Sequence, residues 1–258
     1  MAYQYIKQLA HSSNYGGART RDKIKYIVIH YTGNDGDKAA NNAKYFQSAN
    51  RNASAHYFID SNNVYQSVGD LNVAWSVGGA KYSDCANTGG GKLYGIATNA
   101  NTLNIELCDD LKNGEVKATQ GTIKNAIALC VELMKKYNID IEHVIRHFDV
   151  NGKKCPSYYI DAKAWQGFKD RLAAALKNAP AEKQENTPQQ APKKIYYRVT
   201  ATAGLNVRAG AGTGHKKLFA LACGDRFEYL DRSGDWIRGN DNAGRTGYAY
   251  AKWLELDA

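Results

Sequence analysis

Long apolar segments are missing from this sequence, which limits the classes of protein it can belong to. No run approaches the ~20 apolar residues of a membrane-spanning helix, so we expect no membrane insertion. The first residues, MAYQYIKQLAHSSNYGG, contain no apolar core of signal-peptide length. We therefore expect synthesis in the cytosol without a standard signal peptide.

Cysteine is scarce and irregularly spaced. The five cysteines are an odd number and include no CxxC pair, so they do not form a disulfide framework. We expect most of them to be reduced, as in proteins made in a cytosol.

Acidic residues are outnumbered by basic ones, 25 against 34, which gives a formal charge of +9. The surface therefore favours polyanions such as nucleic acid, an anionic membrane or a cell-wall polymer. The sequence has no zinc knuckle, recognition helix or RNP-type aromatic strand, so charge alone does not predict nucleic-acid binding.

Proline is rare, and three of the four prolines lie in residues 177–194, KNAPAEKQENTPQQAPKK. This stretch has no aliphatic side chain larger than alanine, so it cannot bury enough apolar surface to offset its ordering entropy. We interpret it as a flexible linker between a domain at 1–176 and a domain at 195–258.

The first domain alternates strand and helix patterns. Short apolar, β-branched runs predict buried strands, and Thr119 is placed to cap a long amphipathic helix with an apolar stripe. We therefore expect an α/β fold, with a central mixed β-sheet flanked by helices. The expected elements are strands at 25–32, 102–108 and 143–147, two strands within 54–68, and helices at 37–52, from Thr119 onward and at 161–176.

The second domain shows short β-type runs separated by glycine-containing turns about every ten residues, and it has no helical stripe. This pattern predicts a small all-β barrel. It is poor in paired acids, histidines and nucleophiles, so we interpret it as a binding module.

Two histidines and a cysteine lie at or just after expected strand ends. His147 and Cys155, taken alone, are most simply a strand-end residue and a small buried residue. His30 changes this interpretation because it ends another buried strand, and ligand sites in α/β sheets gather at strand ends. Two imidazoles and one thiolate would hold a catalytic Zn²⁺ with a fourth position for water, whose pKa the metal lowers to about 7.

Two charged residues could assist the hydrolysis of an amide. Lys153 precedes Cys155 by two positions, so an extended backbone would put its ammonium near the metal, where it could stabilise an oxyanion. The alternative is a solvated loop lysine. Glu106 lies among apolar neighbours in a strand, where an unpaired carboxylate is costly, so it has either a structural partner or a catalytic role.

The ordered motifs YIVIHYT, SAHYFID, AWSVGG, NIELC and RHFDVNGKKCP resemble the zinc-dependent N-acetylmuramoyl-L-alanine amidase family over roughly residues 20–170. The resemblance implies hydrolysis of the amide between the lactyl group of N-acetylmuramic acid and L-alanine in peptidoglycan. It also implies that His30, His147 and Cys155 bind zinc, that Lys153 stabilises the oxyanion and that Glu106 is the acid/base.

Two positions depart from the family pattern. Ala55 stands where some members have a catalytic tyrosine, so Glu106, or else Tyr31 or Tyr57, must carry proton transfer. Ser76 follows Trp75 where a histidine is common, which would alter how substrate is held. We expect Tyr31, His56 and Trp75 to contact substrate, with a buried structural role as the alternative for His56.

The tail, with LNVRAGAGT near its start and GYAYAKWL near its end, resembles a bacterial SH3 (SH3b) domain, which implies a small SH3-like barrel that binds cell-wall peptide. Five aromatic residues could form a groove or belong to the barrel core: Tyr196, Trp236, Tyr248, Tyr250 and Trp253. The resemblances imply a phage endolysin or bacterial autolysin that acts at the cell wall after lysis, passage through a holin-opened membrane, or secretion.

Two other functions are compatible with the same motifs. One is a protein that binds peptidoglycan without cleaving it, and the other is a zinc endopeptidase that cuts the stem or cross-bridge peptide. The expected partner in each case is peptidoglycan and not nucleic acid. The sequence leaves the oligomeric state open, and a monomer is compatible with it.

Overall fold

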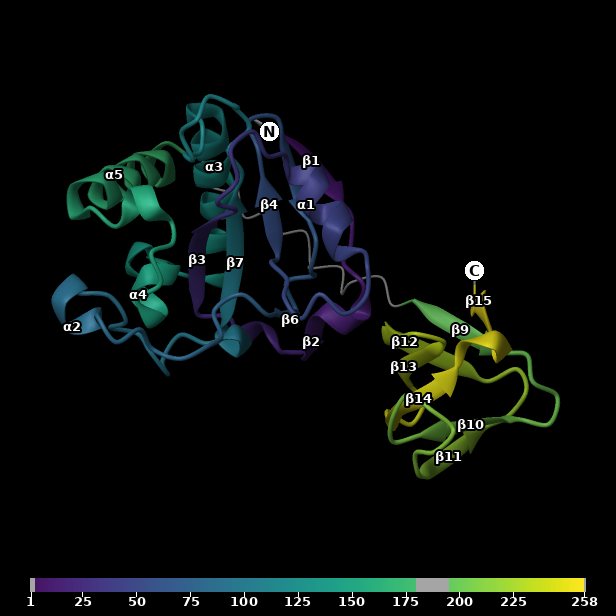
Figure 1. The fold of residues 1–258 in the computed structure, drawn as a ribbon. Helices are drawn as coiled ribbons and strands as arrows, with labels where there is room; N and C mark the ends of the chain where they lie inside the picture. The colour runs from purple at the N-terminus through teal and green to yellow at the C-terminus, as the bar shows by residue number, and fades with distance from the viewer. Residues whose placement is uncertain (1–2, 180–194, 258) are drawn as a thin grey trace. The chain divides into compact units, whose positions relative to one another are not determined.

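The computed structural model describes residues 3–179 and 195–257, which belong to two compact units, Met1–Pro180 and Ala181–Ala258 (Figure 1). Most of the expected linker, residues 180–194, lies outside the described residues. Its first two residues, Lys177 and Asn178, instead complete helix α5 (Ala162–Asn178). The helix ends there because Ala179, which precedes a proline, takes an extended conformation.

The first unit is built on a six-stranded mixed sheet. Only β4 and β5 pair antiparallel, while the other neighbours run parallel. The expected mixed α/β sheet is confirmed. In spatial order the strands are β1 (Gln4–Lys7), β5 (Asn63–Gln66), β4 (Tyr57–Ile59), β7 (Thr102–Leu107), β3 (Tyr26–Tyr31) and β8 (Val144–Arg146).

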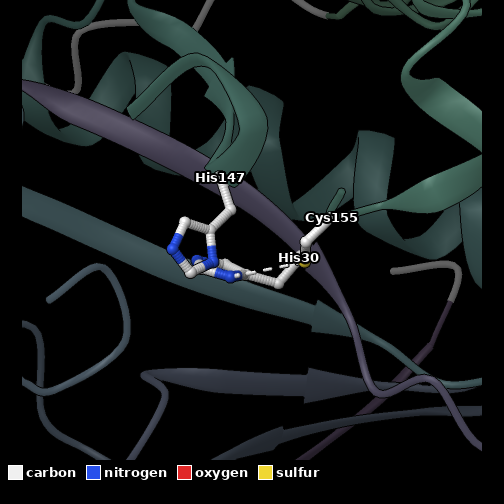
Figure 2. A group of neighbouring side chains, drawn as sticks. All are labelled: His30, His147 and Cys155. Atoms are coloured by element: carbon white, nitrogen blue, oxygen red, sulfur yellow. Dashed lines mark hydrogen bonds between the residues drawn. The ribbon is translucent and has the colours of Figure 1, made fainter. Parts of the chain in front are cut away.

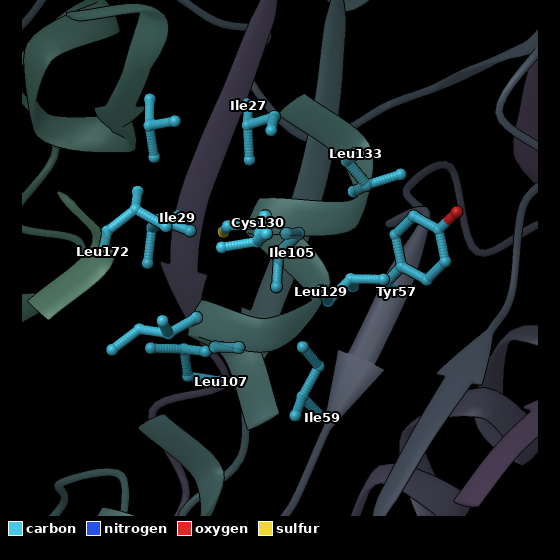
Figure 3. Close-up of a cluster of buried hydrophobic side chains, with 14 of the residues drawn as sticks. Ile27, Ile29, Tyr57, Ile59, Ile105, Leu107, Leu129, Cys130, Leu133 and Leu172 are labelled. Atoms are coloured by element: carbon cyan, nitrogen blue, oxygen red, sulfur yellow. The ribbon is translucent and has the colours of Figure 1, made fainter. Parts of the chain in front are cut away.

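The two faces of this sheet have different surroundings. In β3, Ile27 and Ile29 belong to the largest apolar cluster, whereas Val28 belongs to a separate cluster. Because successive side chains of a strand point to opposite faces, His30 lies on the face of Val28. Helices α3 (Gln120–Tyr137) and α5 contribute to the large cluster (Figure 3), so the site residues of β3 lie on the opposite face.

Helix α3 forms as predicted. The Thr119 side chain accepts a hydrogen bond from the Thr122 amide at 3.3 Å, which caps the helix. The predicted apolar stripe is buried in full: Ile123, Ile127, Cys130, Val131 and Met134. The helix ends at Asn138, whose φ of 53° is left-handed.

Helix α1 (Ala39–Phe46) is shorter than the helix expected at 37–52. Its first amide is held by Asp60, whose Oδ2 accepts from the Ala39 N–H at 3.1 Å. Asn50 and Asn52 have φ values of 58° and 54°, so the chain beyond α1 cannot continue as a right-handed helix. Ala39 and Ala43 pack on Phe58, which places α1 on the face of the sheet opposite the large cluster.

Shorter elements complete the first unit. A two-stranded sheet pairs β2 (Tyr15–Ala18) with β6 (Asn72–Ala74). The remaining helices are α2 (Cys85–Thr88) and α4 (His147–Asn151), with 3₁₀ turns at Ser12–Asn14, Arg21–Lys23, Asn99–Asn101, Ile141–His143 and Ser157–Tyr159. In residues 3–179 and 195–257, no helix combines the length and apolar character needed to cross a bilayer.

The second unit is an antiparallel seven-stranded sheet around its own core, which confirms the predicted all-β fold. Val207, Phe227, Ile237 and Ala249 are buried at its centre. Its strands are β9 (Tyr196–Val199), β10 (Leu205–Arg208), β11 (Lys217–Leu221), β12 (Arg226–Ser233), β13 (Trp236–Asn240), β14 (Thr246–Tyr250) and β15 (Leu254–Asp257), with a 3₁₀ turn at Ala251–Trp253.

A buried carboxylate, Asp70, joins the sheet to the end of α3. It is 6% exposed and accepts hydrogen bonds from the Tyr57 hydroxyl, from Gln66 Nε2 at 3.1 Å, from Lys136 Nζ at 2.8 Å and from the Tyr137 hydroxyl at 2.7 Å. Burial by itself would raise the pKa of Asp70, but these hydrogen bonds outweigh burial and hold that pKa below its ordinary value.

We expect Asp70→Asn to lower the free energy of unfolding by about 2–4 kcal/mol at pH 7, because the amide leaves buried donors without an acceptor. Since the folded-state pKa is depressed, the stabilising effect of Asp70 is present above its unfolded pKa of about 3.9 and is lost as the pH falls through the folded pKa. Urea unfolding at pH 7 and at acid pH measures this difference. Asp170→Asn, at an exposed position of α5, is the control, and equal losses in both variants would contradict the role of Asp70.

Candidate metal centre

The structure brings His30, His147 and Cys155 together, with their candidate ligand atoms all within 4.8 Å of one another. The two imidazole rings lie 4.7 Å apart between centroids, and His30 Nδ1 is 3.9 Å from the Cys155 sulfur (Figure 2). The side chains come from β3, from the start of α4 and from the loop after α4. All three are at most 3% exposed.

Helix α4 places His147. The sequence pattern predicted that His147 ends a strand, but β8 stops at Arg146 and His147 is the first residue of α4. The Asp149 carboxylate binds the Arg146 guanidinium at 2.6 and 3.0 Å and accepts from the Arg146 amide at 2.8 Å, so it fixes the first turn. His147 therefore projects from a held helix start, and the predicted convergence is retained.

Gly152 ends α4 and brings the chain back toward Cys155. Its φ is 90°, and a Cβ at this position would lie 2.2 Å from the Cys85 sulfur. Only glycine combines this conformation with this close approach. The Phe148 amide then donates to the Cys155 carbonyl at 3.0 Å, which fixes the loop that carries the sulfur.

Hydrogen bonds determine which His30 nitrogen faces the cluster. The Thr102 hydroxyl donates to the Thr98 carbonyl at 2.9 Å, so its oxygen accepts from Asn104 Nδ2 at 3.1 Å. Asn104 Oδ1 is then turned toward His30 Nε2 at 3.0 Å, and Nε2 must carry the proton. His30 Nδ1 therefore offers its lone pair toward Cys155.

The two histidines have the protonation state that a metal site requires. Burial lowers the pKa of His30 to about 4 and that of His147 to about 2, so both rings are neutral and offer lone pairs at neutral pH. Among the residues that the structure describes, neither ring nitrogen of His147 has a hydrogen-bond partner. Burial raises the pKa of the Cys155 thiol to about 12, and a bound cation would favour the thiolate.

Glu106 lies beside this cluster. It pairs with His30 across β3 and β7, and its Oε1 is 3.9 Å from His30 Nδ1. Burial raises the pKa of Glu106 to about 8, while the Lys153 ammonium acts in the opposite direction. Within the described part of the chain Glu106 Oε2 is buried without a hydrogen-bond partner, so no structural partner explains this carboxyl.

Lys153 lies on the cluster's open side. Its side chain is exposed and lines a pocket together with His147. The Lys153 charge is close enough to lower the pKa values of His30 and His147 further after burial has lowered them. This position is compatible with the predicted contact to a carbonyl oxygen.

The alternative proton-transfer tyrosines lie on the other face of the sheet. Tyr57 and the ring of Tyr31 pack with the large apolar cluster, and the Tyr57 hydroxyl donates to Asp70. The Tyr31 ring stands edge-on to Tyr158, with 5.7 Å between centroids. Of the three candidates for proton transfer, Glu106 is therefore the one whose carboxyl lies beside the candidate metal ligands.

The remaining two predicted substrate contacts differ in accessibility. Trp75 follows β6 and is partly exposed, and a Cβ on Gly16 would lie 3.2 Å from its indole nitrogen. His56 is 0% exposed, and its Nδ1 accepts from the Asn104 amide at 3.0 Å while Nε2 donates to the Asn72 carbonyl at 3.1 Å. The expected substrate contact of His56 is therefore corrected to the structural alternative.

The site residues predicted from the sequence do not include Asn104, although the strand pattern indicates it. It precedes Glu106 by two residues in the same buried strand, so the strand period places both side chains on one face. A buried amide two positions before the predicted acid indicated a second polar contact to the site.

In the second unit, three of the five predicted aromatic residues line one groove of about 620 Å³: Trp236, Tyr250 and Trp253. The Trp236 and Tyr250 rings are 5.4 Å apart. Tyr196 instead lies under the Arg226 guanidinium, 4.1 Å from ring centroid to Cζ.

Comparison with protein families assigns both units. Residues 20–158, which are more than half of the 258-residue chain, match the family model described as N-acetylmuramoyl-L-alanine amidase. The chain belongs to this amidase family. Residues 203–255 match the bacterial SH3 domain, so an amidase-family unit is joined to an SH3b unit, as the motifs predicted.

Curated relatives of this amidase-family chain come from bacilli. The chain is 30% identical to the N-acetylmuramoyl-L-alanine amidase CwlA of Bacillus subtilis (strain 168) over 196 residues, covering 75% of this chain and 66% of the relative. It is also 30% identical to the amidase BlyA of the same strain over 168 residues, covering 64% and 45%. The chain thus spans about half to two thirds of the length of these relatives.

Solved structures show the same fold in the first unit. The structure of PlyL matches with a TM-score of 0.53 at 25% identity, covering 66% of this chain and 96% of PlyL. The catalytic domain of XlyA matches with a TM-score of 0.51 at 25% identity, covering 66% and 99%.

Proposed function

We propose that the protein is a peptidoglycan hydrolase that cleaves the amide bond between N-acetylmuramic acid and the L-alanine of the stem peptide. The observation that carries this proposal is the convergence of His30, His147 and Cys155 beside Glu106, whose Oε2 is buried without a hydrogen-bond partner among the described residues, in a chain of the amidase family. The names of the relatives support the choice of bond.

We propose Zn²⁺ as the cofactor, because the residues fit it. Two neutral imidazoles and a thiol offer the nitrogen and sulfur ligands that zinc prefers, and three protein ligands are the usual set in catalytic zinc sites. The partnerless His147 nitrogens are buried polar atoms that a metal would satisfy. Bound here, zinc would polarise the amide carbonyl and activate water.

The other residues would move protons and balance charge. Glu106 is placed to take a proton from the attacking water and to return it to the leaving amine, and its raised pKa of about 8 suits both directions near neutral pH. The Lys153 ammonium would offset the charge that develops on the carbonyl oxygen. Asn104 would hold His30 in the orientation that keeps Nδ1 toward the metal.

The SH3b unit would hold the enzyme on the cell wall. Its aromatic groove offers the partly apolar, partly polar surface that extended peptides use. Binding through this unit would raise the local concentration of the catalytic unit on the same polymer. The formal charge of +9 favours an anionic wall.

Fragment analysis of purified sacculi tests the proposed bond. We expect digestion to release free stem peptides with new L-alanine amino termini and no new reducing sugars, and a zinc chelator should stop this release. Mass spectrometry of the products is the measurement. Intact lactyl–alanine linkages with a cut peptide would show an endopeptidase, and unaltered sacculi with a zinc-loaded protein would show a binding protein.

A further inference from the structure

A pocket of about 490 Å³ opens beside the candidate metal centre, within the size range of small-molecule sites. His147 forms part of its wall, so the pocket begins where the scissile amide would lie. The pocket is therefore a candidate site for one of the two groups that flank that amide, the glycan or the stem peptide.

The charges on the pocket wall have one sign. Lys81 and Lys153 line it, and no aspartate or glutamate is among the described residues of the wall. Besides His147, the other described side chains of the wall carry no carboxyl group and no further amino or guanidinium group. The pocket therefore presents a positive surface to its ligand.

Asn151 holds the two lysine-bearing segments together. It is 3% exposed; its Oδ1 accepts from the Lys153 amide at 3.1 Å, and its Nδ2 donates to the Gly78 carbonyl at 3.3 Å. The Asn151 carbonyl also accepts from the Tyr82 amide at 2.8 Å, on the other side of Lys81. The backbone of the pocket is thus organised before a ligand binds, which lowers the entropic cost of binding.

The chemistry of the two flanking groups decides between them. The glycan flank carries uncharged hydroxyl and acetamido groups, whereas the stem peptide carries carboxylates. Ammonium groups form their strongest hydrogen bonds with carboxylates, so the pocket matches the peptide flank.

We propose that this pocket binds a carboxylate of the stem peptide and that Lys81 selects a free carboxylate over its amidated form. The proposal rests on the proposed amidase function, and it adds a specificity residue outside the metal ligands. Lys153 contributes to the same positive surface but would also contact the reacting carbonyl. A substitution of Lys81 therefore tests peptide recognition without changing the proposed catalytic residues.

Two soluble muramyl peptides test the proposal. They are identical except that one has the free α-carboxylate of D-glutamate at its second residue and the other has the corresponding amide. For the wild-type protein we expect a KM about fivefold lower for the free carboxylate, the effect of one solvent-accessible charge pair. Lys81→Met keeps the length of the side chain and removes its charge, so it should abolish the preference and leave kcat unchanged.

Lys92→Met is the matched control, because Lys92 is an exposed lysine that does not line this pocket. Equal KM values in the wild type, a preference for the amide, or a preference that persists in Lys81→Met would overturn the proposal. If the wild-type protein cleaves neither these peptides nor purified sacculi, the proposed function fails instead. Calorimetric binding of the same two peptides then decides the carboxylate preference on its own.

Discussion

Cys155→Ser is expected to weaken zinc binding by more than about 100-fold and to remove peptidoglycan cleavage. Loss of a hydrogen-bonding partner behind a ligand already costs 10–100-fold, and loss of the ligand itself should cost more. A serine hydroxyl is rarely ionised at neutral pH, so it cannot replace the thiolate. Cys155 is 2% exposed, and serine is nearly isosteric with it, so the packing should survive.

Metal content after equilibration in a zinc buffer and the rate of sacculus lysis are the two measurements for this variant. Cys223→Ser makes the same chemical change at an exposed cysteine of the SH3b unit and should leave both unchanged. Full zinc occupancy in Cys155→Ser would show that the sulfur is not a ligand.

Glu106→Gln is expected to lower turnover by about 10²–10⁴-fold while zinc stays bound, the range typical of a lost general acid/base. Glutamine has the shape of the protonated acid but cannot accept and return a proton. The fold should be retained, because no described residue depends on Glu106 Oε2 for a hydrogen bond.

Steady-state rates, zinc content and thermal unfolding of the same preparation distinguish this outcome from unfolding or metal loss. Glu115→Gln, at an exposed position, is the control. Unchanged turnover in Glu106→Gln would remove Glu106 from the mechanism without affecting membership of the amidase family.

Much of the first unit follows from local patterns. The β-branched run around His30 and the apolar run around Glu106 predict the two strands, and the Thr119 cap and its apolar stripe predict α3. These elements could be predicted from the sequence because each depends on residues close together in the chain.

Other parts of the site depend on contacts between distant segments. Helix α4 has only five residues, and it exists through the Arg146–Asp149 pair and the left-handed Gly152. Local periodicity therefore predicted a strand that includes His147. The loop with Lys81 has no periodic pattern, and its position depends on hydrogen bonds to Asn151, more than sixty residues away in the sequence.

The alternation in β3 and β7 also separates the requirements of folding from those of chemistry. Ile27, Ile29 and Ile105 support the apolar interior, whereas His30 and Glu106 occupy the intervening positions. Substitutions at the intervening positions can thus change reactivity at little thermodynamic cost to the scaffold. Inactive versions of this protein should remain intact, wall-binding reagents, suited to trapping uncleaved polymer for structural work.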